Sequence, residues 1–211
     1  MVPYKYICVE GNIGAGKTTL AHDICKKTGA TLVLEEFEKN PFLPSFYEDN
    51  EKFALQTEMY FLHQRFRQLT GIFQVPANRN GLVISDYFLA KSKVFGRVTL
   101  SGHELELFEQ YVDLLLEQVV SPDLIVFINR DIAQLQHNIS ARARAIEAGI
   151  KGHYLQRLKQ AYEDYFAKQS QNRVVIVSTK SVQDNTNVLN SADLLSIIER
   201  EWPLGITDLS L

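Results

Sequence analysis

Short runs of consecutive apolar residues recur along this chain. A strand that is covered by helices on both faces has no polar face, so it gives a continuous apolar run rather than an alternating pattern. The runs predict five strands, over residues 4–9, 31–34, 82–85, 124–129 and 173–177.

Between these runs, apolar residues recur three and four positions apart, as they do on one face of a helix. The longest such segment, residues 51–73, carries Leu62, Phe66 and Leu69 at this spacing. Strands that alternate with helices favour right-handed crossovers and a doubly wound parallel sheet. We therefore expect an α/β chain without a domain boundary and with a polar loop over residues 180–190. The predicted helices cover residues 17–28, 51–73, 102–119, 132–144, 151–168 and 192–202.

The segment between the first predicted strand and the first predicted helix reads GNIGAGKT and matches G-x-x-x-x-G-K-[ST]. Glycines let the backbone approach a ligand closely, and the N–H groups of the loop and of the helix start then point at a phosphate. Lys17 would contact the β- and γ-phosphates, and Thr18 would hold Mg²⁺. The residues expected to bind the nucleotide are Gly11, Asn12, Ile13, Gly14, Ala15, Gly16, Lys17, Thr18 and Thr19.

Acidic residues follow three of the predicted strands, where the ends of parallel strands face the ligand crevice. Glu35 and Glu36 follow the second strand, and one of them could accept the proton of an attacking hydroxyl, unless both are simply solvated. Asp86 follows the third strand and could orient a metal-bound water or a hydroxyl, cap the next helix, or do both. Asp131, after the fourth strand, is a rival that also has the position of a helix cap.

Basic residues gather in the segment SARARAIE, residues 140–147, ahead of Gly149. Arg142 and Arg144 are two positions apart, so on a helix they would point to different sides. They could belong to a solvated face, or to a lid whose cations stabilise a transferring phosphoryl group.

Composition and charge narrow the classes of protein. The formal net charge is −3, so no overall basic field favours binding to nucleic acid or to an acidic membrane. The apolar runs are too short to cross a bilayer, and the first residues lack the pattern of a signal peptide. The two cysteines, Cys8 and Cys25, predict no disulfide framework and indicate a reducing cytoplasm.

Several segments resemble the deoxyribonucleoside kinase family. The segment YICVEGNIGAGKTTL resembles the family's phosphate loop, and the resemblance continues through LEEFEKNPFLPSFYED and YFLHQRF. The segment RARAIEAGIKGHYLQRL resembles the family's lid, R-x-R-x-x-E, with the helix that follows it. The resemblance covers about residues 4–170, and the NPFL sequence after the acidic residue is most similar to the bacterial, purine-preferring branch.

This resemblance implies a three-layer α/β/α P-loop fold with a five-stranded parallel sheet. It implies one kinase domain over residues 1–211, with a lid around residues 138–152, and a homodimer that pairs through helices within residues 82–97 and 102–119. The implied reaction is transfer of the γ-phosphoryl group of ATP, with Mg²⁺, to the 5′-hydroxyl of a deoxyribonucleoside.

The acceptor side of the site follows from the resemblance position by position. Glu35 matches the family's general base on the 5′-hydroxyl, and Tyr47 matches a tyrosine that binds the 3′-hydroxyl. Glu58 and Arg65 match a glutamine and an arginine that read the base. They are two helical turns apart and so share one face, although surface charge would also explain the spacing.

The donor side follows in the same way. Arg142, Arg144 and Glu147 match the lid over ATP, where the arginines are expected to be catalytic together with the lysine of the phosphate loop. Asp86 matches the acid of the family's D/E-R-S motif. With Thr18, it is expected to hold Mg²⁺.

Three departures from the family pattern bear on function. The D/E-R-S motif reads Asp86-Tyr87-Phe88, so its arginine is missing, and Lys91 is a candidate to replace the charge. Asn138 stands where the family has a further lid arginine. Glu58 replaces the glutamine, and since an ionised glutamate only accepts hydrogen bonds, the base should present donors, which favours a purine.

Two other functions fit parts of the sequence. The segment SDYFLAKS faintly resembles thymidylate kinases, which phosphorylate nucleoside monophosphates, but the arginine needed for the acceptor's phosphate is absent. A nucleotide-binding regulator without turnover would explain the lost arginines, whereas Glu35 beside an intact phosphate loop argues against it.

Overall fold

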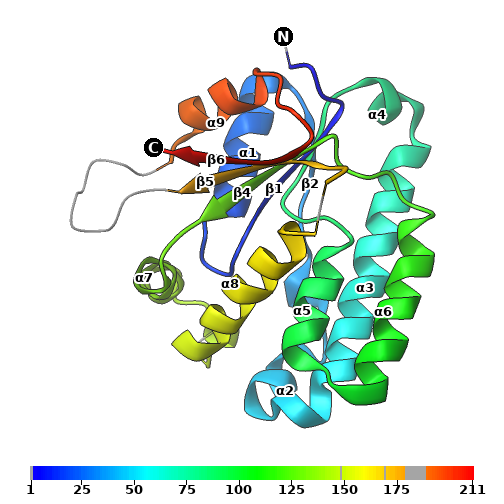
Figure 1. Ribbon diagram of the computed structural model, residues 1–211. Helices are drawn as coiled ribbons and strands as arrows, with labels where there is room; N and C mark the ends of the chain where they lie inside the picture. The colour runs from blue at the N-terminus through cyan, green and yellow to red at the C-terminus, as the bar shows by residue number, and fades with distance from the viewer. Residues whose placement is uncertain (1, 148, 169, 179–188) are drawn as a thin grey trace.

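A parallel sheet crosses the centre of the molecule, and helices cover both of its faces (Figure 1). The computed structural model describes residues 2–147, 149–168, 170–178 and 189–211. The predicted loop over residues 180–190 therefore lies largely outside the described residues.

Within the described residues, six strands pair in the order β2-β3-β1-β4-β5-β6, and every pair is parallel. The five predicted strands are confirmed, with bounds that shift by at most two residues. The strands are β1 (Tyr6–Gly11), β2 (Thr31–Val33), β3 (Val83–Ser85), β4 (Leu124–Asn129), β5 (Arg173–Ser178) and β6 (Gly205–Ser210).

The predicted count of five strands is wrong because β6 adds a sixth at the edge of the sheet. It pairs with β5 along its whole length, from Gly205 opposite Arg173 to Ser210 opposite Ser178. Its residues alternate between half-buried and exposed, and Ile206 is 41% exposed. An edge strand with a solvent-facing side lacks a continuous apolar run, so a search for such runs misses it.

The helices divide between the two faces of the sheet, which confirms the three-layer α/β/α fold. Apolar side chains of α1 and α9 pack on one face, and those of α3, α5, α6 and α8 pack on the other. No helix within the described residues is both long enough and apolar enough to cross a membrane. The helices are α1 (Lys17–Thr28), α2 (Leu43–Glu48), α3 (Asn50–Gln74), α4 (Pro76–Asn80), α5 (Lys91–Thr99), α6 (Gly102–Leu116), α7 (Ile132–Arg142), α8 (Gly152–Phe166) and α9 (Ser191–Ile198).

The strand order brings the carboxyl ends of β1, β2 and β3 together. Tyr6 of β1 and Thr31 of β2 both lie opposite Val83 of the central β3. The phosphate loop after β1, Glu35 after β2 and Asp86 after β3 therefore reach the same edge of the sheet.

Two glycines of the phosphate loop, Gly14 and Gly16, have left-handed backbones with φ of 85° and 92°. A Cβ atom on Gly14 would lie 2.7 Å from the carbonyl oxygen of Leu135 and 3.0 Å from Cγ1 of Ile139, both on α7. A Cβ atom on Gly16 would have no such neighbour within 4 Å. Gly14 thus serves both the turn and the close packing of α7 on the loop.

We therefore predict that Gly14→Ala destabilises the fold more than Gly16→Ala. Gly16→Ala carries the cost of a left-handed alanine, about 1–2 kcal/mol. Gly14→Ala adds a steric cost of about 1–3 kcal/mol against α7. Urea denaturation measures the free energy of unfolding of both variants, and equal losses would contradict the packing of α7 on the loop.

Candidate active site

Hydrogen bonds to three other segments hold the phosphate loop in shape. Asn138 on α7 donates a hydrogen bond from Nδ2 to the carbonyl oxygen of Gly14 over 2.8 Å. Arg130, just after β4, donates a hydrogen bond to the carbonyl oxygen of Ala15 over 2.9 Å. Asn12 of the loop donates to the carbonyl oxygen of Leu155 on α8 over 2.8 Å. The lid position that Asn138 occupies therefore contributes a backbone clamp instead of a cation.

The same loop leaves its own donors available for an anion. α1 begins after Gly16, and no side chain among the described residues caps its first N–H groups. The Lys17 ammonium lies 3.0 Å from the carbonyl oxygen of Asn12 and points across the loop. Helix N–H groups beside a lysine are the donor set that a nucleotide's phosphates require, so the loop fits ATP. Thr19 is exposed on α1 and outside the cavity described below.

Asp86 connects the phosphate loop to the end of β2. Its Oδ2 accepts a hydrogen bond from the Thr18 hydroxyl over 2.5 Å, and its Oδ1 accepts one from the backbone N–H of Glu35 over 2.8 Å. The alternative interpretation of Asp86 as a helix cap is wrong, because α5 begins only at Lys91. Asp131, the rival acid, does cap α7.

Thr18 and Asp86 together offer hydroxyl and carboxylate oxygens, which suit Mg²⁺. The described residues contain no group of three or more His, Cys, Asp or Glu side chains placed to hold a metal alone. Mg²⁺ commonly binds through one or two protein oxygens together with substrate phosphates and water, so this pair fits the ion.

Glu35 lies between two cations. Its Oε1 is 2.7 Å from Nε of Arg65, and its Oε2 is 2.9 Å from Nζ of Lys91. Burial alone would raise the pKa of this carboxyl, but Lys91 and Arg65 more than offset burial and lower the pKa to about 2. The neighbouring Glu36 is exposed and pairs with Lys39, so the choice between the two glutamates falls on Glu35.

Lys91 is buried, and it pairs with a second acid that the sequence analysis missed. Its ammonium is 3.7 Å from Oε1 of Glu10, which also accepts hydrogen bonds from the N–H of Gly11 and from the hydroxyl of Tyr162. Burial raises the pKa of Glu10, and Lys91 opposes that shift. A lone acid at the end of an apolar strand, directly before a phosphate loop, was the available signal for Glu10.

The predicted site residues line one cavity of about 100 Å³ beside the phosphate loop. Its wall is rich in aromatic rings, namely Phe37, Phe46, Tyr47, Phe61, Phe95 and Tyr154. Those rings offer flat apolar surfaces. The predicted residues that line it are Ile13, Gly14, Lys17, Thr18, Glu35, Tyr47, Glu58, Arg65, Asp86, Arg142, Arg144 and Glu147.

Glu58 and Arg65 share one face of α3, as their spacing predicts, and both are almost fully buried. Oε1 of Glu58 lies 3.1 Å from the hydroxyl of Thr99 on α5. Burial raises the pKa of Glu58 to about 7, with Arg65 and Thr99 opposing that shift. Arg65 also donates to the hydroxyl of Ser92 over 2.8 Å, which anchors it between α3 and α5.

The predicted lid arginines both lie beside Glu147. Nε of Arg142 is 2.6 Å from one carboxylate oxygen of Glu147, and a terminal nitrogen of Arg144 is 3.7 Å from the other. Helix α7 ends at Arg142, two residues before the predicted end, because Ala143 adopts a left-handed backbone with φ of 48°. The expectation that the two arginines point to different sides is therefore wrong. Arg144 also stacks over Phe37, 4.7 Å from the ring centre.

We predict that Lys91→Met destabilises the fold by about 3–5 kcal/mol, since it leaves the buried Glu10 without its cation and Glu35 with Arg65 alone. Burial already raises the pKa of Glu10 in the parent, and loss of Lys91 raises it further above its value in the unfolded chain, so the stability lost relative to the parent shrinks as the pH falls from 7 to 5. The parent chain keeps the contribution of Glu35 at both pH values, because the lowered pKa of Glu35 lies below this range. Urea denaturation at the two pH values measures both effects.

Lys93→Met is the matched control, because Lys93 pairs with the half-exposed Asp113. It should cost less than about 1 kcal/mol. A loss for Lys91→Met that equals the control, or that does not change with pH, would contradict the buried pairing.

Comparisons with known proteins show the family of this chain. The family model described as deoxynucleoside kinase matches residues 7–200. The deoxyguanosine kinase of Bacillus subtilis (strain 168) is 34% identical over 189 residues, which cover 89% of this chain and 91% of that protein. The deoxyadenosine/deoxycytidine kinase of the same organism is 26% identical over 171 residues, or 76% of each chain.

A solved structure supports the fold independently. The deoxyadenosine kinase from M. mycoides with bound dCTP superposes with a TM-score of 0.75 and 23% identity, over 91% of this chain and 96% of that chain. At this identity the likeness extends to the fold alone. With the family match over most of the sequence, this chain belongs to the deoxynucleoside kinase family, a family of phosphotransferases with an alcohol acceptor.

Proposed function

We propose that this protein is an ATP-dependent kinase that phosphorylates the 5′-hydroxyl of a purine deoxyribonucleoside. The observation that carries the proposal is the position of Glu35. Its carboxylate lies in a cavity lined by aromatic rings, and its backbone N–H binds Asp86, which in turn binds Thr18 of the phosphate loop. An acceptor hydroxyl at Glu35 would therefore lie next to the phosphates of a bound nucleotide.

In this mechanism the phosphate loop and Lys17 bind the ATP phosphates, and Thr18 and Asp86 hold Mg²⁺. When bound, Mg²⁺ supplies positive charge to the phosphates. Glu35 accepts a hydrogen bond from the 5′-hydroxyl and directs its oxygen at the γ-phosphorus. A bond forms between that oxygen and phosphorus as the bond to the leaving ADP breaks, and the hydroxyl proton passes to Glu35.

The low pKa of Glu35 determines how it acts. A strong general base has a pKa near the working pH, whereas Glu35, at about 2, is a weak base that is always ionised. Phosphoryl transfer through a loose transition state depends mainly on positioning. The proton of the 5′-hydroxyl therefore has to leave only late in the reaction, after most of the bond to the leaving group has broken. Glu35 therefore acts first as a fixed acceptor that orients the hydroxyl.

We assign residues 138–152 as a lid. The cavity of about 100 Å³ is smaller than the 300–1,000 Å³ or so of most ligand pockets, so the described conformation must open to admit a substrate. Arg142 and Arg144 close it through Glu147. When ATP is bound, these arginines would give up part of their pairing with Glu147 and contact the negatively charged phosphoryl group that is transferred.

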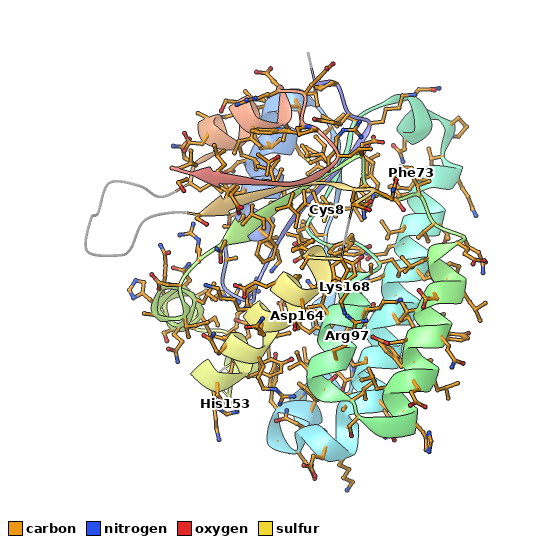
Figure 2. All side chains as sticks on the ribbon, in the orientation of Figure 1. Cys8, Phe73, Arg97, His153, Asp164 and Lys168 are labelled. Carbon is orange, nitrogen blue, oxygen red and sulfur yellow. The ribbon has the colours of Figure 1, made fainter. Side chains whose placement is uncertain are left out.

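The acceptor nucleoside is proposed to bind among the aromatic side chains that line the cavity. We propose that Tyr47 binds the 3′-hydroxyl and that Glu58 and Arg65 bind the base, since all three line the cavity. The deoxyguanosine kinase of B. subtilis, which is named for a purine deoxynucleoside, supports a purine as the substrate, whereas the deoxyadenosine/deoxycytidine kinase of that organism is named for a purine and a pyrimidine. Two free, buried cysteines support a reducing, cytoplasmic location, and Figure 2 shows Cys8 in the central sheet.

A substrate panel tests this function. The protein is incubated with ATP and Mg²⁺ and with deoxyguanosine, deoxyadenosine, deoxycytidine, thymidine and the matching monophosphates. Phosphorylated purine deoxynucleosides support the proposal. Turnover of monophosphates alone would favour the monophosphate-kinase alternative, and tight ATP binding without any product would favour the regulator.

We predict that Glu35→Gln lowers kcat by about 10²–10⁴, because the amide cannot accept the hydroxyl proton. Binding of ATP should be preserved, since Glu35 does not contact the phosphate loop directly. The control is Glu36→Gln, in which the exposed neighbour is changed and kcat should stay within twofold or so of the parent. Activity retained in Glu35→Gln would mean that another group receives the proton.

We also propose that the protein is a homodimer that pairs through α6. Leu107, Tyr111 and Leu114 repeat four and three positions apart on this helix, and they are 65%, 46% and 58% exposed. Such a stripe has the spacing of a helix face that packs on another helix. The resemblance also implies a pairing helix within residues 82–97. Of these residues only those in α5 are helical, since residues 86–90 form no helix.

If this face pairs two copies, Leu107→Glu with Leu114→Glu should give a monomer in light scattering coupled to size exclusion. Leu204→Glu is the control, because Leu204 is similarly exposed, at 53%, but lies outside α6. A parent chain that is monomeric at micromolar concentration would refute the dimer.

A further inference from the structure

Resting on the proposed function, we propose that Glu58 selects between guanine and adenine by its protonation state. The ionised carboxylate binds the guanine nucleoside, and the neutral carboxyl binds the adenine nucleoside. The enzyme would then change its preferred purine within the ordinary pH range of a cell.

The contact with Thr99 is compatible with both forms of Glu58. The Thr99 hydroxyl lies 3.1 Å from Oε1 of Glu58 and 3.0 Å from the carbonyl oxygen of Phe95. A hydroxyl has one proton, so it can donate to only one of these two acceptors. When Thr99 donates to Oε1, that oxygen can be a carboxylate oxygen of ionised Glu58 or the carbonyl oxygen of neutral Glu58. In the neutral form the proton then lies on Oε2, the oxygen that is left for a ligand.

The second oxygen of Glu58 is left for a ligand. Oε2 is buried and has no hydrogen-bond partner among the described residues, while the Glu58 side chain lines the cavity. A buried carboxyl oxygen without a partner costs free energy, and a base edge that supplied a donor would recover it. Only 2% of Glu58 is exposed, so water does not screen this choice of partner.

Charged groups around Glu58 oppose each other, so neither form is strongly favoured. Burial and Glu35 favour the neutral form, whereas Arg65, Thr99 and Lys91 favour the ionised form, and the pKa comes to about 7. Two tyrosines face it as neutral groups, since burial raises the pKa of each far above the working range. The groups facing Glu58 are Arg65 on α3, Lys91 and Thr99 on α5, Glu35 after β2, Tyr47 on α2 and Tyr154 on α8.

The two purines differ in what they present to a carboxyl group. Adenine has an acceptor, N1, beside a donor, its 6-amino group, and so pairs with a neutral carboxyl, which has one donor and one acceptor. Guanine has two adjacent donors, N1–H and its 2-amino group, and so pairs with a carboxylate, which has two acceptors. In each mismatched pairing, one contact sets donor against donor or acceptor against acceptor.

The first test is the ratio of kcat/KM for deoxyguanosine to kcat/KM for deoxyadenosine, measured at pH 6, 7 and 8. The ratio cancels effects of pH on the phosphoryl transfer that both substrates share. It should rise with pH by up to about tenfold per unit, which is the change in the ratio of ionised to neutral Glu58.

Glu58→Gln is the decisive variant, because its amide does not titrate and keeps one donor and one acceptor. Its ratio should be independent of pH and shifted towards deoxyadenosine. Glu51→Gln, on the exposed first turn of the same helix, should keep the parent's pH dependence. A ratio that is constant in the parent, or that rises equally in Glu58→Gln, would overturn the proposal.

Calorimetry in buffers of different ionisation enthalpy gives a readout that does not require turnover. Near pH 7, binding of deoxyadenosine should take up about half a proton and binding of deoxyguanosine should release about half a proton, and Glu58→Gln should abolish both. Binding of both nucleosides without proton exchange would refute the role of Glu58. Absence of phosphorylated nucleoside at every pH would instead refute the proposed function.

Discussion

The ammonium of Lys91 lies in the protein interior between two carboxylates from different strands, and the acceptor side of the site depends on this contact. Glu10 is on the strand that leads into the phosphate loop, and Glu35 follows the strand at the sheet edge. Two buried carboxylates that both lie within 4 Å of one ammonium group would repel each other without that cation, and the repulsion would favour uptake of protons. A cation shared between them keeps Glu35 ionised and fixed, and it ties the strand that leads into the phosphate loop to the residue that we propose as the acceptor's partner.

This arrangement accounts for the missing arginine of the family motif. Where that motif has an arginine after the acid, the chain has Tyr87, which is fully buried and donates to Gln68. Lys91, about one turn later, supplies a positive charge 2.9 Å from Glu35. An ammonium is a point charge and lacks the planar fork of a guanidinium, and Arg65 provides that fork from the other side. Lys91 and Arg65 therefore supply positive charge beside Glu35 although the arginine of the family motif is absent.

The fold was largely predictable because continuous apolar runs identify strands buried on both faces. The sixth strand was not, because an edge strand follows a different pattern. In the site, spacing placed Glu58 and Arg65 on one face, and the resemblance predicted roles for Glu35 and the lid residues, which the structure brings to the same cavity. Sequence could not show that Ala143 turns the chain so that both lid arginines reach Glu147. Nor could it show that Glu10 shares Lys91 with Glu35, because both depend on contacts between distant segments.

The central claim is that Lys91 and Arg65 keep the carboxyl group of Glu35 ionised. The most direct measurement is the carbon-13 chemical shift of the Glu35 carboxyl, assigned by comparison with Glu35→Gln and followed from pH 7 to pH 4. The account predicts no titration in this range, because the pKa of Glu35 is about 2. A transition near the ordinary glutamate pKa of about 4.3, or above it, would contradict the account.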